Sequence, residues 1–232
     1  MDILISDETP VGFDLSLTVP QGFCRDLLIV ELTAALSRVP IPTDSLIQIW
    51  IEDAQIDDDD LLKLIGFSSY RDLWQMRCKF PPNGEGIATR PFVCGVDDKA
   101  FLEVNSRAFS WHPEQGSLDL PKLNHAFGEE WFDNEGFLLL EVDNRLAGFC
   151  WTKAHHEGDL VLGEIYAIAV DPDFHGRGFG KPLTIAGLNH LSNIGADLGM
   201  LYVESDNKPA IQIYEDIGFT HFSTNRAYRN SV

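Results

Sequence analysis

Residues 165–181 read IYAIAVDPDFHGRGFGK, and this stretch decides the fold of the chain. An apolar strand runs into a glycine-rich loop, and the loop opens a helix. Gly176, Gly178 and Gly180 carry no side chain, so the backbone N–H groups of the loop stay accessible. The N-terminus of the following helix adds positive potential. The segment therefore predicts a cradle for a pyrophosphate group, and the plainer alternative is an ordinary glycine-rich turn.

The residues around the glycines favour the phosphate interpretation. Arg177 and Lys181 supply positive charge, and Pro182 suits the first helical turn, where its missing N–H costs nothing. Two common nucleotide motifs are excluded. Asp171-Pro172 separates the strand from the glycines, so the pattern is not the dinucleotide-binding GxGxxG, and the chain contains no GxxxxGK[ST] loop.

Two motifs resemble those of the GNAT acetyltransferase superfamily. Val170-Asp171-Pro172, continued by residues 175–180, is similar to its acyl-CoA loop V-x-P-x-x-[QR]-x-x-G-x-[GA], with His175 in place of the usual Gln or Arg. Residues 207–219 match its second pattern, N-x-x-A-x-x-x-Y-x-x-x-G-F. The resemblance implies an α/β (α+β mixed sheet) GNAT acyl-CoA N-acyltransferase fold, with acetyl-CoA as cosubstrate.

A longer resemblance covers residues 87–230. They are similar to the C-terminal half of the mycothiol synthase family, whose members are tandem two-domain GNAT enzymes. HPEQG at 112–116 and WTK at 151–153 carry this resemblance, because these segments are not general to the superfamily. It implies transfer of acetyl from acetyl-CoA to the cysteinyl amine of cysteinyl-glucosaminyl-inositol, giving mycothiol. Two alternatives stay open: a GNAT enzyme for another primary amine, such as a protein N-terminus or an amino sugar, and a non-catalytic acyl-CoA-binding module.

Two residues are candidates for the chemistry. Glu164 precedes the loop on the same strand, where we expect residues 164, 166, 168 and 170 to share one face. Its carboxylate would border the acyl site and accept the amine proton, directly or through water. Tyr214 stands on the helix after Asn207, and the superfamily pattern implies that its phenol protonates the departing CoA thiolate. The plainer interpretations are a surface glutamate and a packing tyrosine.

The family resemblance also implies which residues contact the two substrates. Glu114, Lys153 and Tyr202, together with Glu164, match positions that hold the sugar and cysteinyl parts of the acceptor. The acetyl-CoA-binding residues expected from the two motifs are Ile168, Ala169, Val170, His175, Gly176, Arg177, Gly178, Phe179, Gly180, Lys181, Asn207, Lys208, Ala210, Ile211 and Gln212.

A metal site is not expected. The four cysteines are widely spaced and form no CxxC pair. The adjacent His155-His156 would point to opposite faces of a strand. The run Asp57–Asp60 lacks the glycine and the glutamate of an EF-hand loop, so we expect a solvated helix start that the helix dipole favours.

Composition limits the classes of partner. The 232-residue chain carries a net charge of −19, which disfavours nucleic acids and anionic membrane surfaces. Hydrophobic residues make up 44%, enough for a packed core. The few cysteines fit a reducing compartment, and we see neither a signal peptide nor a membrane-spanning run. We therefore expect a cytoplasmic protein, monomer or homodimer, with a small-molecule amine substrate.

An internal repeat appears when the chain is shifted by 152 residues. Trp50-Ile51-Glu52 then aligns with Tyr202-Val203-Glu204, and Ile65-Gly66-Phe67 aligns with Ile217-Gly218-Phe219. The same shift places Arg25 on Arg177. Matches at one constant offset, in the same order, indicate a duplication. The first copy begins near the equivalent of Lys153, so it lacks a counterpart of residues 91–152.

The repeat and a proline- and glycine-rich linker at 80–86 divide the chain into two domains. We expect a truncated, degenerate GNAT-like domain over 1–82 and a complete catalytic GNAT domain over 87–232. At the 152-residue offset, Cys24, Asp26 and Leu28 stand where the loop has its three glycines. We therefore expect the first domain to support the catalytic one without a cofactor site of its own.

Hydrophobic patterning predicts the remaining elements. In the second copy we expect helices over 97–109, 121–132, 179–195 and 208–217, and strands over 137–141, 146–154, 163–170, 200–204 and 219–228. In the first copy we expect strands near 3–6, 13–19, 46–51 and 70–77, and helices near 24–38 and 58–65.

Overall fold

The computed structural model describes residues 2–6, 12–39, 42, 44–110 and 115–230. The chain forms two compact units. Unit 1 comprises Met1–Gln75, Glu204–Asp206 and Phe222–Val232, and unit 2 comprises Met76–Val203 and Asn207–His221. The spatial division therefore differs from the linear boundary expected between residues 82 and 87, because the C-terminal strand contributes to both units.

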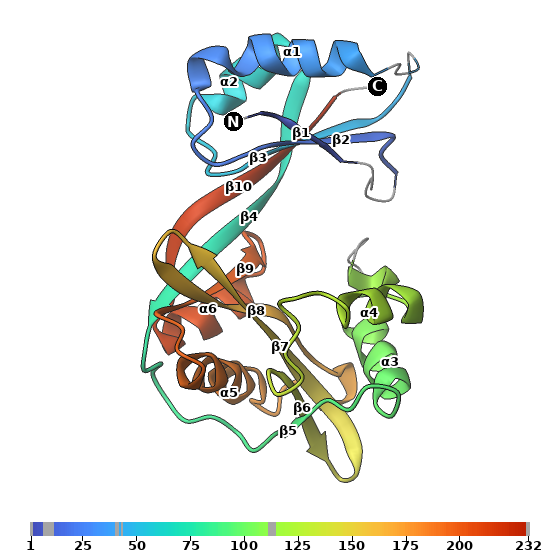
Figure 1. The fold of residues 1–232 in the computed structure, drawn as a ribbon, viewed down its shortest axis with the longest axis vertical. Coiled ribbons are helices and arrows are strands. Elements are labelled where there is room, and N and C mark those ends of the chain that lie inside the picture. The colour runs from blue at the N-terminus through green and yellow to red at the C-terminus, as the bar shows by residue number, and fades with distance from the viewer. Residues whose placement is uncertain (1, 7–11, 40–41, 43, 111–114, 231–232) are drawn as a thin grey trace. The chain divides into compact units, whose positions relative to one another are not determined.

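Unit 2 is built on a mixed sheet (Figure 1). Strands β5 to β8 are antiparallel neighbours in chain order, β9 pairs parallel to β8, and β4 follows β9. A two-residue turn with positive φ at Asp143 and Asn144 joins β6 to β7, the strands expected over 137–141 and 146–154. The strands are β4 (Phe67–Lys79), β5 (Arg90–Pro91), β6 (Phe137–Val142), β7 (Arg145–Glu157), β8 (Leu160–Val170), β9 (Leu198–Glu204) and β10 (Thr220–Asn230); β4, β9 and β10 continue into unit 1.

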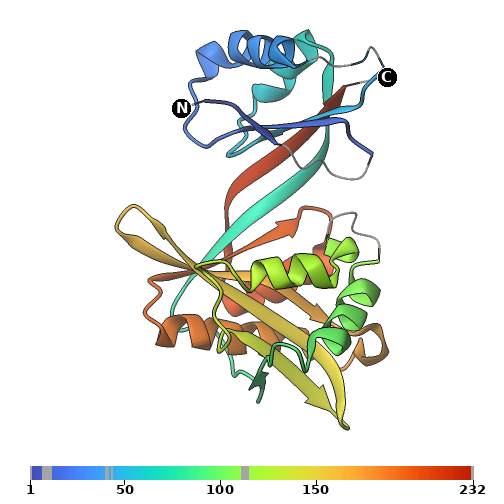
Figure 2. The ribbon, with the colours of Figure 1, turned by 45° about the vertical axis from the view of Figure 1, so that its right-hand side comes forward.

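Helices cover both faces of the unit 2 sheet, as Figure 2 shows. Residues of α3 and α4 pack against Trp151 on one face. On the other face, a Cβ added to Gly187 of α5 would collide with Cys150 Sγ and Ile165 Cδ1, so α5 lies directly on the strands. Within the described residues no helix is both long and apolar enough to cross a bilayer. The helices are α3 (Asp98–Ala108), α4 (Leu120–Ala126), α5 (Gly180–Asn193) and α6 (Lys208–Ile217), with 3-10 turns at Gln115–Ser117 and Pro172–Phe174.

Aromatic rings form the core between the sheet and α3. Phe137 stacks between Phe92 and Trp151, with ring centroids 4.3 and 4.4 Å apart, and Phe101 meets it edge-on at 4.9 Å. All four side chains are buried. Aromatic pairs of this kind contribute about 0.5–1.5 kcal/mol each beyond the burial of their area. This cluster fixes the position of β7, which carries the predicted site residue Lys153.

The same cluster corrects one predicted helix. The helix expected over 121–132 ends at Ala126. Beyond it the chain turns, and Phe132 packs against Phe127 at 4.9 Å while Trp131 reaches Trp151 at 5.7 Å. Packing of these partly buried rings against the core cluster accompanies the early end of the helix.

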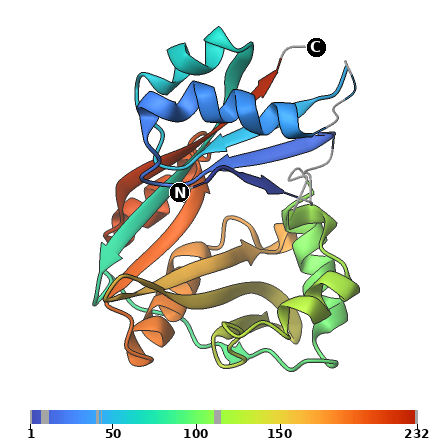
Figure 3. The same cartoon turned by 45° about the horizontal axis from the view of Figure 1, so that its top comes forward.

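Unit 1 is a smaller sheet with helices packed on it (Figure 3). Strand β1 (Leu4–Ser6) is antiparallel to β2 (Leu15–Val19), which is parallel to β3 (Ile47–Ile51). Strand β10 pairs antiparallel with β3 through residues 226–229. The helices are α1 (Leu28–Arg38), preceded by a 3-10 turn at Arg25–Leu27, and α2 (Asp58–Leu64). The core side chains of this unit include Leu17, Val19, Leu28, Leu32, Ile49, Ile51 and Tyr228.

The structure reproduces the repeat at the predicted offset. A shift of 152 residues places α1 on residues 180–190, within α5, and α2 on residues 210–216, within α6. Gly66 and Gly218 both end their helices with a positive φ, 85° and 113°, which glycine adopts without strain. One arrangement was not predicted: β3 of the first copy pairs with β10 of the second copy, while β4 of the first copy is the neighbour of β9. The last strands of the two copies are exchanged.

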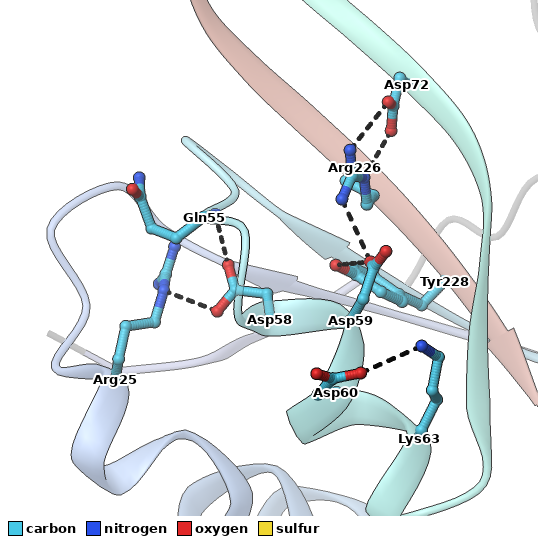
Figure 4. Close-up of polar contacts among 9 residues, drawn as sticks. All are labelled: Arg25, Gln55, Asp58, Asp59, Asp60, Lys63, Asp72, Arg226 and Tyr228. Atoms are coloured by element: carbon cyan, nitrogen blue, oxygen red, sulfur yellow. Dashed lines mark hydrogen bonds and ion pairs between the residues drawn. The ribbon is translucent and has the colours of Figure 1, made fainter.

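The aspartate run at the start of α2 is not simply solvated (Figure 4). Asp58 is 1% exposed, accepts a hydrogen bond from the backbone N–H of Gln55 at 2.8 Å, and pairs with Arg25 Nε at 3.0 Å. Asp59 accepts from Tyr228 and pairs with Arg226. Charged partners within unit 1 therefore correct the expectation of a fully solvated helix start, since these carboxylates connect α2 to its neighbours.

Arg25 shows how the first copy differs from the second at the position of the glycine loop. It occupies the position that corresponds to Arg177, but its guanidinium is held by Asp58 and by the backbone oxygens of Glu52 and Asp53. The segment Arg25–Leu27 is a 3-10 turn, where the second copy has its glycine loop. The arginine of the first copy is thus occupied by protein groups.

Candidate active site

The glycine loop of unit 2 has an open conformation. Gly176 and Gly178 have φ values of 75° and 76°, which side chains other than glycine rarely adopt. A Cβ added to either residue would meet no atom within 4 Å, so a ligand can approach the backbone closely. Phe179, the N-cap residue of α5, makes no capping hydrogen bond through its side chain. The first-turn N–H groups therefore point to a region where an anion fits.

Ion pairs hold the start of the loop. Asp171 is 2% exposed, accepts from the backbone N–H of Asp173 at 2.9 Å and pairs with Arg107 at 3.2 Å. Asp173 pairs with Arg107 and Arg145, each at 2.7 Å. Hydrogen bonds from these two arginines hold the pKa of Asp173 at about 2. The turn that precedes the glycines is thus fixed by side chains from α3 and β7.

The cationic residues of the loop have defined contacts. The guanidinium of Arg177 lies 4.9 Å from the ring centroid of buried Phe174, and Lys181 Nζ donates to the backbone oxygen of Asp216 at 3.3 Å. His175, the departure from the superfamily motif, places Nε2 2.9 Å from the carbonyl oxygen of Val170. It therefore fastens the loop to the end of β8, which explains how histidine serves at this position.

Strand β8 contains a bulge that the sequence did not reveal. Trp151 pairs with Ala167 and Thr152 with Ile165, which leaves Tyr166 as the extra residue. Tyr166 packs against Trp151 at 5.3 Å, and Ala167 and Ala169 belong to the same aromatic cluster. The expectation that 164, 166, 168 and 170 share one face is therefore wrong beyond Tyr166. The bulge shifts the alternation by one residue, so Tyr166 and Ala167 lie on the same face.

The pairing of β8 with β9 is short. The parallel ladder joins Leu162–Ile165 to Leu198–Leu201, although both strands continue beyond these residues. The expected ligands Ile168, Ala169 and Val170 thus lie on the part of β8 outside this ladder. Backbone groups at such an edge can pair with an extended, amide-containing ligand in the manner of an added strand.

Glu164 precedes the bulge on β8, so the expected alternation of faces still holds at this residue. Its side chain is 12% exposed, and it stands opposite Lys153 in the β7–β8 register. Burial raises the pKa of Glu164, and the positive charge of Lys153 partly opposes this rise. His155 Nδ1 lies 3.7 Å from Glu164 Oε2. A buried carboxylate with a raised pKa is suited to accept a proton near neutral pH.

Lys153 is held by aromatic rings. Its Nζ lies 4.7 Å from the ring centroid of Trp131 and 5.7 Å from that of Tyr166. Sequence reasoning named Lys153 but missed Trp131 and Tyr166 as its neighbours. The indole follows a helix that ends earlier than predicted, and Tyr166 is the bulged residue, so hydrophobic periodicity alone could not bring them together.

Tyr214 is buried on α6. It is 9% exposed, packs edge-on against Phe219 at 5.8 Å, and has a pKa raised by burial and by the nearby Cys150 thiol. The phenol therefore stays protonated throughout the physiological pH range and can serve only as a proton donor. Burial also raises the pKa of Cys150 to about 12, so its thiol stays neutral.

The α6 motif residues have mainly structural contacts. Asn207 caps the helix by accepting from the backbone N–H of Ala210 at 3.3 Å. Gln212 donates to Asp216 Oδ1 at 3.1 Å, and Ile211 is buried. Lys208 is exposed. Of the predicted acceptor contacts, Tyr202 is 39% exposed on β9, and Glu114 lies outside the described residues.

A separate open groove runs along α3. It has a volume of about 970 Å³, and its lining includes Leu102, Arg107, Leu118 and Arg145. None of the predicted site residues that the structure describes lines it. The groove meets the loop region only through Asp171, so the acyl site proposed from the sequence is a different place.

Comparison with known proteins agrees with this geometry. Residues 100–219 match the Acetyltransferase (GNAT) family. A mycothiol acetyltransferase of Actinosynnema mirum is 40% identical over 91% of this chain and 73% of its own, and one of Streptomyces coelicolor is 43% identical over 80% and 62%. A solved GCN5-related N-acetyltransferase from Sphaerobacter thermophilus superposes with a TM-score of 0.69 at 21% identity, over 93% of this chain and 72% of that one, and so supports the fold. This chain belongs to the mycothiol acetyltransferase family of GNAT proteins.

Proposed function

We propose that this chain transfers the acetyl group of acetyl-CoA to the cysteinyl amine of cysteinyl-glucosaminyl-inositol, forming mycothiol. The observation that carries the proposal is the placement of a buried carboxylate, Glu164, on the strand that runs into the open glycine loop. A base and an anion cradle on one strand–loop–helix segment are what an acetyl-CoA-dependent N-acyltransferase needs. The name shared by the curated relatives suggests the acceptor.

Acetyl-CoA would bind through backbone groups. The pyrophosphate would rest on the N–H groups of residues 176–181, where three glycines carry no Cβ, with Arg177 and Lys181 supplying positive charge. The amide-bearing arm would extend along the part of β8 that lies beyond its ladder with β9. We place Asn207, Lys208, Ala210, Ile211 and Gln212 at the second side of this cofactor site, with Asn207 acting mainly as the helix cap.

The reaction would exchange a C–S bond for a C–N bond. Glu164 accepts a proton from the acceptor's ammonium group, and the free amine attacks the thioester carbonyl carbon. The C–S bond then breaks, and the Tyr214 phenol protonates the departing thiolate. The nitrogen loses its second proton as the amide forms, and this proton restores the phenol. The raised pKa of Glu164 suits its role, since it makes this group a stronger base than an exposed carboxylate, and Tyr214 retains the proton that it would donate.

The acceptor would lie along the face of Lys153. The ammonium group of Lys153, held over the ring of Trp131, would bind hydroxyl groups of the pseudodisaccharide. Tyr202 and Glu114 are the further contacts expected from the family. Trp131 would present an aromatic surface to a sugar ring.

The test is a panel of amines with acetyl-CoA. The panel holds the cysteinyl pseudodisaccharide, the same sugar without cysteine, free cysteine and a peptide with a free N-terminus. Product mass and loss of thioester absorbance serve as readouts, because the acceptor carries its own thiol. We expect the cysteinyl pseudodisaccharide to have the highest kcat/KM by at least about 100-fold, or about 2.7 kcal/mol of transition-state binding. Equal rates with free cysteine would contradict the proposed acceptor, and no acetylation of any amine would contradict the enzyme assignment.

A further inference from the structure

His155 lies beside the proposed base, on the same face of β7 as Lys153. Its Nδ1 is 3.7 Å from Glu164 Oε2. This nitrogen is buried and has no hydrogen-bond partner among the residues that the structure describes. A buried polar atom without a partner costs stability, so its presence calls for an explanation. The rest of the ring is accessible, since the side chain is 35% exposed.

We propose that His155 relays the proton from Glu164 to solvent, an inference that rests on the proposed function. The acceptor's ammonium proton passes to the Glu164 carboxylate and then to Nδ1 of the neutral imidazole. The imidazolium releases its Nε2 proton to water, which leaves the free carboxylate and the Nδ1–H tautomer of the neutral ring. Proton exchange with solvent returns this tautomer to the Nε2–H form before the next turnover. The small movement needed to bring Nδ1 and Oε2 within hydrogen-bond distance is a side-chain rotation.

The charges around His155 favour the neutral ring that the relay needs. Burial lowers the pKa of His155, and the positive charges of Lys153, Arg77 and His156 lower it further, while Glu157 opposes them. Glu157 is itself paired with Arg77 at 2.7 Å. At neutral pH the ring is therefore an acceptor.

The pKa values of Glu164 and His155 are shifted toward each other. Burial raises the pKa of Glu164 from that of an ordinary carboxyl group, and burial lowers the pKa of His155 from that of an ordinary imidazole. Proton transfer is fast and reversible when donor and acceptor pKa values are close. Without a relay, a carboxyl group only 12% exposed would have to return its proton directly to water during each turnover.

The neighbouring histidine provides a matched control. His156 follows His155 on a regular part of β7, where His155 pairs with Leu162 and His156 with Val161. Successive side chains therefore point to opposite faces of the sheet. His156 is exposed and plays no part in the proposed relay.

The experiment compares His155→Asn, His155→Gln and His156→Asn with the wild-type protein, using the best acceptor from the amine panel. We expect both His155 variants to lose about tenfold in kcat near pH 7, below the usual range for a direct acid or base, with KM changed less than about twofold. Added imidazole should restore most of the loss, and His156→Asn should stay within about twofold of wild type. Two substitutions guard against a variant that fails to fold.

The outcomes separate the relay from the proposed function. If Glu164→Gln slows the reaction but the folded His155 variants do not, the relay is wrong and the base assignment stands. A His155 loss that imidazole does not restore would also overturn the relay, because a structural defect cannot be replaced by a free base. If Glu164→Gln itself leaves the rate unchanged, both the base assignment and the relay that depends on it fall.

Discussion

Gly178 provides the sharpest test of the phosphate cradle. Its φ of 76° strains any side chain by about 1–2 kcal/mol, and Asn tolerates this region better than most residues. Asp and Asn have nearly the same shape, so Gly178→Asp and Gly178→Asn differ mainly by one negative charge. Since a Cβ at Gly178 meets no atom within 4 Å, both variants should fold.

The expected difference follows from Coulomb's law. A carboxylate about 6 Å from each of two phosphate charges costs about 0.7–2.8 kcal/mol per charge for effective dielectric constants of about 80 and 20. We take a total of about 2–3 kcal/mol, which corresponds to a Kd about 30- to 150-fold weaker for Asp than for Asn. The difference should shrink as salt rises from about 0.05 to 0.5 M, because salt screens exposed charges.

The assay is isothermal titration with CoA, together with thermal melting of each variant. Gly195→Asp is the matched control, because Gly195 also has a positive φ (93°), meets no atom within 4 Å and follows the other end of α5. It should leave CoA affinity within about twofold of wild type. Equal Kd values for Gly178→Asp and Gly178→Asn, in folded proteins, would refute a pyrophosphate site at this loop.

Four further predictions follow from other parts of the structure. Glu164→Gln should slow acetylation most at mildly acidic pH, by about 10²–10⁴-fold, because the acceptor is then an ammonium ion and needs a base; a deficit independent of pH would argue against that role. The same variant should raise the Tm at neutral pH and lose this gain in acid, because a carboxyl group with a raised folded-state pKa destabilises the protein only when it is ionised. Tyr214→Phe should lower kcat about 100-fold while the Tm changes little, since the ring keeps its contact with Phe219; an unchanged kcat would remove the phenol from the mechanism. Asp58→Ala should destabilise unit 1 by about 3 kcal/mol, because it removes the buried carboxylate that pairs with Arg25 and accepts from the N–H of Gln55, and CoA titration should still show one site per chain; denaturant unfolding and titration check the two statements.

The local elements that form the candidate site could be predicted from the sequence. The strand, the glycine loop and the start of α5 all depend on residues close together in the chain, so patterning and motif spacing were enough to predict them. The repeat was also visible, because a constant offset of 152 residues relates α1 to α5 and α2 to α6. Arg25–Leu27 carries no glycine, and the loss of the loop in the first copy followed directly.

The tertiary structure decided what depends on distant partners. The bulge at Tyr166 arises from the register between β7 and β8, and a sequence does not show where a ladder slips by one residue. Trp131 reaches Lys153 only because α4 ends at Ala126 and its following residues turn into the aromatic core. The contact of His155 with Glu164 joins two strands through side-chain packing. Likewise, the pairing of β10 with β3 depends on which strand edge is free in the folded chain. The sequence does not show whether β4 or β10 takes this place, because the two strands have similar local patterns.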